Sequence, residues 1–352
     1  MMTIQLVIEN ALLKEALGQV LSGQHLSRGE ARDVMANVMD GHATSAQIGA
    51  LLAGLRLKGE TVDEIAGFAE AMRSRAYQVV TSHERLLDTC GTGGSGIHKL
   101  NVSTVAAIIA SSASVRVAKH GNRSASSRSG SADVLEALGV NIQLTSEEAA
   151  QCLERIGICF MFAQVYHPAM KHAAAPRKEL GVRTVFNMLG PLTNPAGADR
   201  QVLGIYDRTK TNTIAAVLRE LGLKRALVVA SEDGLDEISL SAPTQVSELK
   251  NGEVFTYTIT PEELGLRTQP LKNVLGGDAS TNAQIIRGLL YGEQGAHRDI
   301  VLANAGACIY VAGQSGSIAE GVRIAAEAID NGLANQKLDQ WIAVTGGLSH
   351  VS

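Results

Sequence analysis

The sequence has few aromatic residues, few prolines and no long apolar run. Its 352 residues include only five Phe, six Tyr, one Trp and seven Pro. Such a scarcity of aromatic side chains argues against a surface on which nucleic-acid bases stack. No stretch approaches the roughly 18 uninterrupted apolar residues of a membrane span, and Glu9, Lys14 and Glu15 interrupt the region where a signal peptide needs an apolar segment. We therefore expect a cytoplasmic protein with no membrane partner.

The chain also lacks a positive net charge and paired cysteines. Lys and Arg number 31 against 35 Asp and Glu, giving a formal net charge of −4, which argues against nucleic acid as a partner. Neither a CxxC pair nor metal-ligand spacing occurs among Cys90, Cys152, Cys159 and Cys308. We expect reduced thiols, as in the cytosol. No base is recognisable beside Cys90, so a buried thiol is favoured there over a nucleophile.

Glycine, by contrast, is abundant. The chain has 36 Gly, about a tenth of all residues against a usual value of roughly 7%. With 45% hydrophobic and 19% charged residues the composition is that of a globular protein, and the length allows one large domain or two of ordinary size. So much glycine indicates tight turns and close backbone approaches, as in an α/β enzyme.

The first 76 residues are predicted to be helical. Ser27, Thr44 and Thr61 are each followed three residues later by Glu or Gln, which is the signature of a capping box at a helix start. Apolar residues then recur at helical spacing, so each helix has one stripe to bury. The two clearest stripes are Ile48, Leu51, Leu52 and Leu55, and Ile65, Phe68, Ala69 and Met72. This pattern predicts a small all-helical N-terminal domain.

From residue 85 short apolar runs alternate with helical segments. The runs RLLDTC, VRVAKH, ICFMFA, QVLGIYD and RALVVAS predict strands. Such alternation predicts an α/β domain with a mostly parallel central sheet flanked by helices, and with ligands at the carboxyl ends of the strands. Polar and apolar residues alternate over 243–262 around Asn251-Gly252, which predicts an antiparallel hairpin.

The expected division of the chain is discontinuous. Residues 1–76 are assigned to the helical domain, joined by roughly 166–197, which interrupt the strand and helix rhythm. Residues 77–165 and 198–352 are assigned to the large α/β domain.

A glycine-rich turn follows the first expected strand. The segment GTGGSG at 91–96 leaves backbone amides accessible, and Ser103 and Thr104 are placed to cap a helix expected from about Val105. The positive end of such a helix favours an anion, so a diphosphate fits here. The pattern is neither GxGxxG nor a P-loop, which leaves ATP and dinucleotides without support. A plain structural turn is the alternative interpretation.

A second polar loop follows the next strand. The segment KHGNRSASSRSGS at 119–131 has three cations, five serines and two glycines, and it leads into a helix. These residues supply charge and short-range donors for phosphate oxygens. A solvated basic loop is the alternative interpretation. Two polar loops in series, each directly after a strand, favour phosphate binding over that alternative.

An acidic pair follows a third strand. Asp236 and Glu237, in DGLDEIS, would repel one another without a counter-ion, and their oxygens suit Mg²⁺ held partly through a substrate phosphate. Most acidic pairs on surfaces bind nothing, so only the two phosphate loops favour a metal. His167 and His172 are five residues apart, on different faces of a helix, so solvated or capping roles are expected for them.

These segments resemble the anthranilate phosphoribosyltransferases. The resemblance is carried by GTGG at 91–94, NVST at 101–104, KHGNRSASSRSGSADVLEALG at 119–139, HPAMKHAAAPRKELGVRTVFNMLGPLTNP at 167–195 and DGLDE at 233–237. It implies the second step of tryptophan biosynthesis, in which anthranilate and phosphoribosyl pyrophosphate give phosphoribosyl-anthranilate and pyrophosphate with Mg²⁺. It also implies a homodimer and allows association with other enzymes of that pathway.

The resemblance assigns roles to individual residues. Anthranilate is assigned to Gly91, Asn122 and Arg177, and Mg²⁺ to Ser103, Asp236 and Glu237, with His120 as a candidate proton acceptor. Arg177 is singled out by the resemblance alone; without it, Arg177 would be read as a surface arginine. Phosphoribosyl pyrophosphate is assigned to Gly91, Gly94, Ser95, Lys99, Asn101, Val102, Ser103, Thr104, Lys119, His120, Gly121, Asn122, Arg123, Ser124, Ala125, Ser126, Ser127 and Ser131.

The first loop departs from the family's common form. Ser95 stands where the family has Asp, Lys99 where it has Thr and Leu100 where it has Phe, so the loop is more positive by about two charges. We expect Lys99 to offset part of the charge that an additional Mg²⁺ would neutralise, weakening the dependence of turnover on magnesium.

The chemistry expected from the resemblance needs no strong base. An aromatic amine is neutral at pH 7, so positioning and electrostatic stabilisation of the leaving pyrophosphate should dominate. A pyrimidine nucleoside phosphorylase is the enzyme alternative, since it would use similar phosphate loops, but KHGNR and the Asp236-Glu237 pair argue against it. A non-catalytic binder of nucleic-acid backbone is the other alternative, and the net charge disfavours it.

Overall fold

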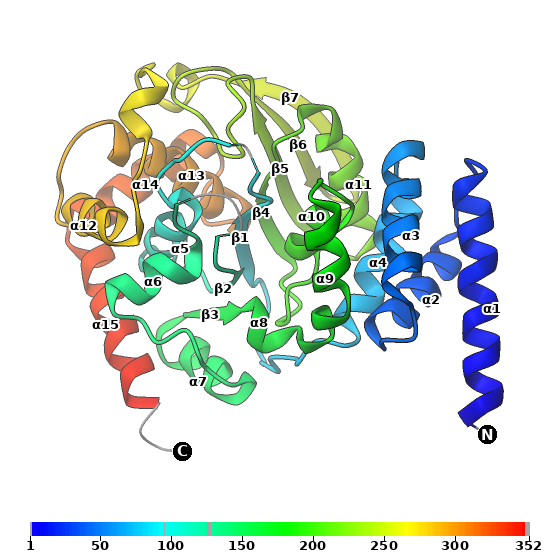
Figure 1. Cartoon of the computed structure of the whole chain (residues 1–352). Coiled ribbons are helices and arrows are strands. Elements are labelled where there is room, and N and C mark those ends of the chain that lie inside the picture. Colours follow the sequence, from blue (N-terminus) through cyan, green and yellow to red (C-terminus); the bar gives the residue numbers. More distant parts are fainter. Residues whose placement is uncertain (1, 95, 125–127, 349–352) are drawn as a thin grey trace.

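A computed structural model describes residues 2–94, 96–124 and 128–348 of the chain. A group of helices from the N-terminal quarter lies beside a larger body built on one sheet, as Figure 1 shows. Four of the predicted substrate residues, Ser95, Ala125, Ser126 and Ser127, lie outside the described residues. The predicted fold class, a small helical part and a large α/β part with a mostly parallel sheet, is confirmed.

The N-terminal part consists of helices, as the capping boxes predict. Ser27, Thr44 and Thr61 each accept a hydrogen bond from the backbone three residues on, and the Glu or Gln at that position bonds back to the cap. The apolar stripes of the third and fourth helices are buried. The four helices are α1 (Met2–Leu21), α2 (Arg28–Met39), α3 (Ser45–Lys58) and α4 (Val62–Arg73).

The sheet has seven strands in the order β3-β2-β1-β4-β5-β6-β7. The first five in this order are parallel, while β6 pairs antiparallel with β5 and with β7. Asn251 and Gly252 link β6 to β7 with φ of 54° and 81°, the left-handed geometry that a two-residue hairpin needs. The strands are β1 (Leu87–Gly91), β2 (Val117–Gly121), β3 (Ile158–Phe162), β4 (Arg200–Gly204), β5 (Arg225–Ser231), β6 (Thr244–Lys250) and β7 (Glu253–Ile259).

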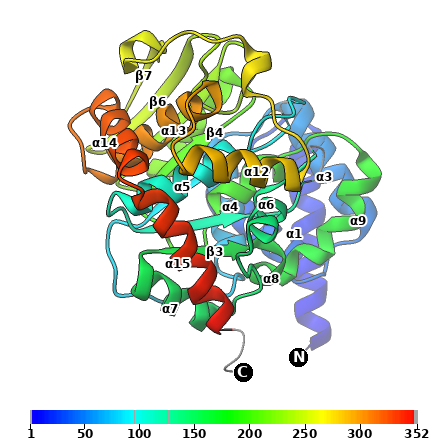
Figure 2. The ribbon, with the colours of Figure 1, turned by 90° about the vertical axis from the view of Figure 1, so that its left-hand side faces the viewer.

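Helices cover both faces of the sheet. Because side chains alternate along a strand, Val229 packs into one apolar cluster and Val228 into another on the opposite face. The first cluster includes α5 and α13, and the second includes α11 and the N-terminal helices. Figure 2 shows α12 and α15 on the outside of the first layer. These helices are α5 (Val102–Ser112), α6 (Ser131–Leu138), α7 (Ser146–Ile156), α11 (Thr211–Glu220), α12 (Ala279–Leu290), α13 (Ala296–Ala312), α14 (Ile318–Asp330) and α15 (Leu333–Leu348).

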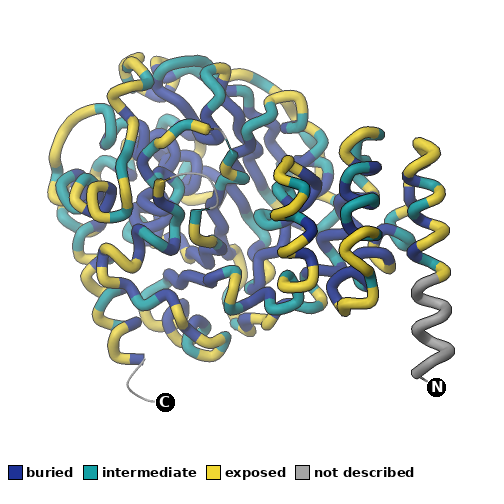
Figure 3. Tube along the Cα trace, viewed as in Figure 1, coloured by how far each residue is buried: buried dark blue, intermediate teal, exposed yellow. Residues whose placement is uncertain are grey.

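The segment between β3 and β4 returns to the N-terminal helices. It contains α8 (Ala163–Tyr166), α9 (Lys171–Leu180) and α10 (Phe186–Leu189), and α9 contacts both α2 and α3. The division of the chain into domains stays a prediction. Figure 3 shows the parallel strands buried in the middle of the molecule, with exposed residues concentrated on the outer helices. The edge strand β7 is largely exposed. The carboxyl ends of β1, β2 and β5 therefore emerge from a rigid core.

One expected helix start is wrong. Helix α5 begins at Val102 and not near Val105, because Asn101 already has the non-helical geometry of a cap (φ −72°, ψ 64°). Ser103 and Thr104 consequently lie inside the first turn and do not cap the helix. The hydroxyl of Thr104 is buried and has no hydrogen-bond partner in the described part of the chain.

Candidate active site

The loops that follow β1 and β5 meet above the middle of the sheet. The backbone N–H of Gly93 donates to Oδ2 of Asp236 at 3.0 Å. The approach is so close that a Cβ on Gly91 would lie 2.6 Å from the same oxygen. A Cβ on Gly204, at the end of β4, would collide with the backbone carbonyl of Asp236. Glycine at these two positions is therefore what lets the acidic loop lie against the strands.

Lys99 bridges the acidic pair that the sequence singles out. Its Nζ donates to Asp236 Oδ1 at 2.7 Å and to Glu237 Oε1 at 2.8 Å, and it lies 3.3 Å from the carbonyl oxygen of Asp236. Both carboxylates are buried. The counter-ion that adjacent carboxylates require is thus supplied by the chain itself.

The three charged groups shift one another's protonation. Burial lowers the pKa of Lys99, but Asp236 and Glu237 raise it more, so it lies above its usual value. Burial raises the pKa of Asp236, yet Lys99 outweighs that effect and the net pKa is lowered. Burial dominates at Glu237, whose pKa is raised. The raised pKa of Lys99 and the lowered pKa of Asp236 both favour an ion pair between a charged ammonium and a charged carboxylate.

The residues expected to bind Mg²⁺ do not form a free set of ligands. Asp236 and Glu237 hold Lys99, and Ser103 accepts a hydrogen bond from Lys119 at 3.4 Å. Within the described residues there is no group of three or more His, Cys, Asp or Glu that could hold a metal ion. With Lys99 in this position the carboxylate pair does not fit a divalent ion.

Two further buried charged residues, Lys119 and Asp88, lie on β2 and β1. The ammonium of Lys119, on β2, donates to the backbone carbonyl of Thr89 on β1. Oδ1 of Asp88 accepts the backbone N–H of His120 at 3.1 Å. Burial raises the pKa of Asp88 to about 6, although the charge of Lys119 opposes this shift. Lys119, 1% exposed, therefore faces inward and supports the loops from below.

Asn101 links the first loop to the second. Its side-chain N–H donates to the carbonyl of Ser129 at 3.1 Å, and its Oδ1 accepts from Asn282 of α12 at 2.9 Å. Oδ1 of Asn282 in turn accepts the backbone N–H of Gly277 at 2.8 Å. Asn282 is fully buried, and no pattern in the neighbouring sequence marks this role.

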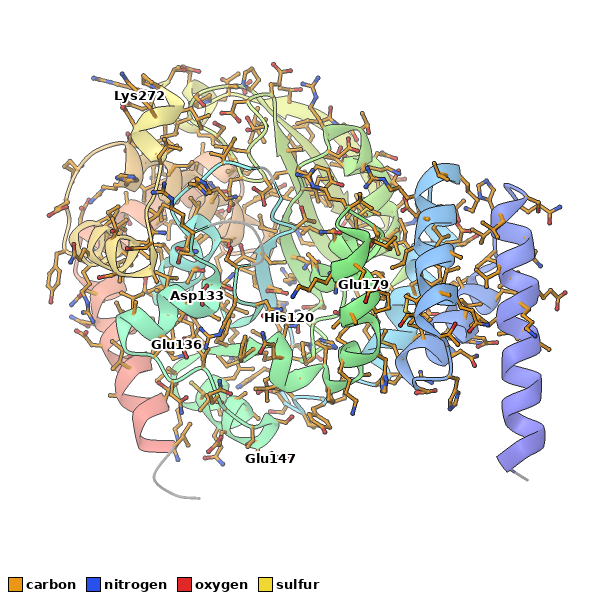
Figure 4. All side chains as sticks on the ribbon, in the orientation of Figure 1. His120, Asp133, Glu136, Glu147, Glu179 and Lys272 are labelled. Atoms are coloured by element: carbon orange, nitrogen blue, oxygen red, sulfur yellow. The ribbon has the colours of Figure 1, made fainter. Side chains whose placement is uncertain are left out.

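The second loop is held by helix α6. Arg123 pairs with Asp133 at 2.8 Å and with Glu136 at 2.5 Å, and its guanidinium lies over the ring of Phe162. The hydroxyl of Ser131 donates to the carbonyl of Asn122 at 3.2 Å. Figure 4 labels Asp133 and Glu136 on α6 and His120 at the centre of the view. Arg123 is thus paired within the protein, and a phosphate would have to compete for its charge.

The ring of His120 packs against that of His167, a contact that the sequence analysis does not predict. The rings of His120 and His167 are 5.0 Å apart, and both residues are buried, contrary to the solvated or capping role expected for His167. Burial, with the charges of His167 and Lys119, lowers the pKa of His120 to about 3, and burial lowers that of His167 to about 4. Nε2 of His120 has no hydrogen-bond partner in the described part of the chain.

Arg177 lies on α9, part-buried. Its guanidinium stacks on the ring of Phe186, 4.8 Å from the ring centroid, and burial lowers its pKa. No carboxylate of the described residues forms an ion pair with it. The N–H groups of this guanidinium can therefore form a bidentate pair with the carboxylate of a ligand.

A cavity of about 360 Å³ opens between the N-terminal helices and the first loop. Arg183 on its wall donates to the carbonyl of Gly94 and stacks on Tyr206, while Arg56 of α3 donates to the carbonyl of Arg183. Of the predicted substrate residues that the structure describes, none lines it. The lining residues are Arg56, Gly59, Glu60, Thr92, Arg183, Thr184, Met188, Ile205, Tyr206, Asp207, Lys210 and Ile214.

Comparison with known proteins decides the family. Residues 14–76 match the glycosyl transferase family helical bundle domain, and residues 83–335 match the glycosyl transferase family a/b domain. The chain is 54% identical over 341 residues to the anthranilate phosphoribosyltransferase of Brevibacillus brevis, covering 97% of this chain and all of that one. The chain belongs to the anthranilate phosphoribosyltransferase family. Its members are glycosyltransferases of tryptophan biosynthesis, so the family named by the sequence resemblance is confirmed.

Solved structures of the family have the same fold. The Thermus thermophilus enzyme is 45% identical with a TM-score of 0.90, covering 94% of this chain and 99% of that one. The Saccharomyces cerevisiae enzyme in complex with PRPP and Mg is 27% identical with a TM-score of 0.88, covering 96% and 98%. Another yeast complex contains 4-fluoroanthranilate. No helix in the described part of this chain has the length and apolarity needed to span a bilayer.

Proposed function

We propose that this chain transfers the phosphoribosyl group of phosphoribosyl pyrophosphate to the amine of anthranilate, giving phosphoribosyl-anthranilate and pyrophosphate. The observation that carries the proposal is the convergence of three loops on Asp236 and Asn101 at the carboxyl ends of the parallel strands. This is the edge at which α/β sheets bind ligands. Membership of the family supplies the substrate pair.

The phosphoribosyl pyrophosphate site is proposed to lie between the first two loops. The positive end of the α5 dipole, at Ser103 and Thr104, favours an anion, and the hydroxyl of Thr104 has no hydrogen-bond partner in the described part of the chain. The residues proposed are the predicted ones, Gly91, Gly94, Ser95, Lys99, Asn101, Val102, Ser103, Thr104, Lys119, His120, Gly121, Asn122, Arg123, Ser124, Ala125, Ser126, Ser127 and Ser131.

Anthranilate is proposed to lie between Arg177, Asn122 and Gly91. The free guanidinium fork of Arg177 matches a carboxylate in a bidentate pair. The unpartnered Nε2 of buried His120 suits a donor or acceptor group of the same ligand. Arg177 thereby orients the amine toward C1 of the ribose, which lowers the barrier by positioning.

The reaction is proposed to need no strong base. The amine nitrogen of anthranilate attacks C1 with its own lone pair, and the C1–O bond to pyrophosphate breaks with the electron pair leaving on oxygen. Nitrogen then loses a proton. A pKa of about 3 makes His120 a weak acceptor for that proton, so we propose a positioning role for His120 and loss of the proton to water.

Mg²⁺ is proposed as the cofactor, as in the yeast complex with PRPP and Mg. Mg²⁺ retains waters and is usually held through substrate phosphates with only one or two protein groups. Its charge would stabilise the leaving diphosphate. Ser103 has a hydroxyl within this region, whereas Asp236 and Glu237 become ligands only if Lys99 moves away.

A cytoplasmic homodimer is proposed as the working form. All four cysteines are free and buried, which supports a reducing compartment. The homodimer rests on the resemblance to the family. Association with other tryptophan-pathway enzymes is a further proposal that rests on the family. Light scattering after gel filtration measures the dimer directly.

The test is the loss of anthranilate fluorescence when phosphoribosyl pyrophosphate and Mg²⁺ are added to the protein. Loss that depends on both substrates supports the proposal. A protein that instead cleaves thymidine or uridine with phosphate would be a nucleoside phosphorylase, and one inactive in both assays would refute the proposed transfer.

A further inference from the structure

Lys99 lies where a metal ion would lie if Asp236 and Glu237 bound one. Its ammonium has three N–H bonds, and three oxygens lie within 3.3 Å of Nζ: one from each carboxylate and the carbonyl of Asp236. These are the oxygen donors that a hard cation prefers. We propose that Lys99 is a built-in counter-cation that replaces a divalent metal ion at this carboxylate pair.

Burial distinguishes this contact from a surface ion pair. The side chains of Asp236 and Glu237 are 2% and 6% exposed, and that of Lys99 is 16% exposed. Two adjacent carboxylates with so little water need a positive charge nearby to ionise. Lys99 provides this charge in the free protein, before any substrate binds.

The backbone around Lys99 fixes the ammonium in place. Lys99 forms an isolated antiparallel bridge with Leu275. On either side, the carbonyl of His98 accepts from Gly276 at 2.8 Å, and Leu100 is fully buried. The position of Nζ is therefore set by the fold, as preorganised electrostatic groups require.

The charges argue against a metal ion beside Lys99. The two carboxylates carry −2 and the ammonium +1, so the group has a net charge of −1. A divalent ion on the same oxygens would lie about 3 Å from an ammonium and repel it strongly. The free protein consequently binds no metal at this pair. Any metal used in catalysis enters with the diphosphate, a statement that rests on the proposed function.

Mn²⁺ binding to the full chain without substrate tests the proposal, with free Mn²⁺ measured by its electron paramagnetic resonance signal. Lys99→Thr removes the charge and leaves both carboxylates, so we expect it to bind one Mn²⁺ about tenfold or more tightly than the wild type. Lys99→Arg keeps the charge and should behave like the wild type. Lys99→Thr with Asp236→Asn should lose the gained site.

Two results would overturn the proposal. The first is wild-type Mn²⁺ binding that Asp236→Asn abolishes, a comparison that needs no Lys99 variant to fold. The second is a folded Lys99→Thr protein, judged by circular dichroism, with wild-type Mn²⁺ affinity. Absence of wild-type binding together with a site gained in Lys99→Thr supports it. Because no turnover is measured, failure of the proposed transfer would be seen only in the fluorescence assay and is distinguishable.

Discussion

The imidazole rings of His120 and His167 pack against each other with centroids 5.0 Å apart and planes tilted by 49°. Both residues are almost completely buried, at 5% and 6% exposure. Neither ring can gain a proton without placing a second charge in this interior, beside Lys119. The pair is therefore a neutral packing element at the end of β2.

Stability should fall as the pH is lowered from 6.5 toward 4. In the unfolded chain these histidines take up protons near pH 6.5, whereas in the folded protein their pKa values are about 3 and about 4. The unfolded state then binds more protons, which favours unfolding by about 1.4 kcal/mol per histidine per pH unit in this window. Urea unfolding at pH 7.5, 6 and 5 measures the slope. Asp88, with a folded pKa of about 6, takes up a proton in the folded state in the same window and opposes part of this slope. His167→Gln should therefore lower the slope by about 1 kcal/mol per pH unit between pH 6 and 5 and leave it unchanged above pH 7. An unaltered slope would contradict the assignment.

Turnover should be independent of pH between about 6 and 8 if His120 acts by position. A general base with a pKa in this range would impose a sigmoid rise in kcat. The neutral, buried imidazole predicts none, because its protonation lies near pH 3. Measuring kcat at saturating substrates in overlapping buffers decides this, and a step near pH 6.5 that disappears in His120→Asn would restore His120 as the proton acceptor.

The sequence predicted what depends on neighbours along the chain. The capping boxes at Thr44 and Thr61, the hairpin at Asn251-Gly252 and the strands of a mostly parallel sheet all follow from local patterns, and the structure has them. The predicted start of α5 is wrong. Ser103 and Thr104 are residue types that often cap a helix, but Asn101 is the residue with the cap geometry. The sequence therefore locates the helix start to within a few residues but does not choose between adjacent polar candidates.

Long-range partners could not be predicted in this way. The acidic pair was recognised as needing a counter-ion, but its partner Lys99 lies 137 residues before Asp236. Nor could spacing have joined His120 to His167, since only the pairing of β2 with β3 brings the following segments together. Asn282 carries no sequence signal, although it holds Asn101 from α12. What the sequence could not supply is the order of the strands in the sheet, which decides which loops meet.

Replacing Arg177 should weaken anthranilate selectively. Arg177→Met keeps the apolar stem against Phe186 and removes the charged fork, so the loss of a charge-assisted bidentate pair should raise the KM for anthranilate about 10- to 100-fold. The KM for phosphoribosyl pyrophosphate should stay within about twofold, because Arg177 is not proposed to touch it. Steady-state kinetics with each substrate varied measures both. An unchanged KM for anthranilate would show that Arg177 does not bind anthranilate.

Adding one methyl group at Gly204 should disrupt the acidic loop. The Cβ of Gly204→Ala would overlap the backbone carbonyl of Asp236, and backbone cannot rotate away as a side chain can. We expect a loss of about 1–3 kcal/mol in unfolding free energy or more, with reduced activity. Gly29→Ala in α2 is the control, since nothing lies within 4 Å of its Cβ. Equal melting temperatures of the two variants would show that the loop moves freely.

Loss of the bond between Asn282 and Asn101 should loosen the phosphoribosyl pyrophosphate site. Asn282→Asp keeps the acceptor for Gly277 but places an oxygen against Oδ1 of Asn101, 2.9 Å away. Rotating the side-chain amide of Asn101 by 180° would relieve this repulsion, but Asn101 would then no longer donate to the carbonyl of Ser129. A buried polar group left without its partner costs about 1–3 kcal/mol, so the KM for phosphoribosyl pyrophosphate should rise about tenfold while that for anthranilate changes less. Asn331→Asp, at an exposed helix end, controls for the added charge. If Asn282→Asp raised both KM values equally, the bond between Asn282 and Asn101 would stabilise the fold in general and would not specifically hold the first two loops together.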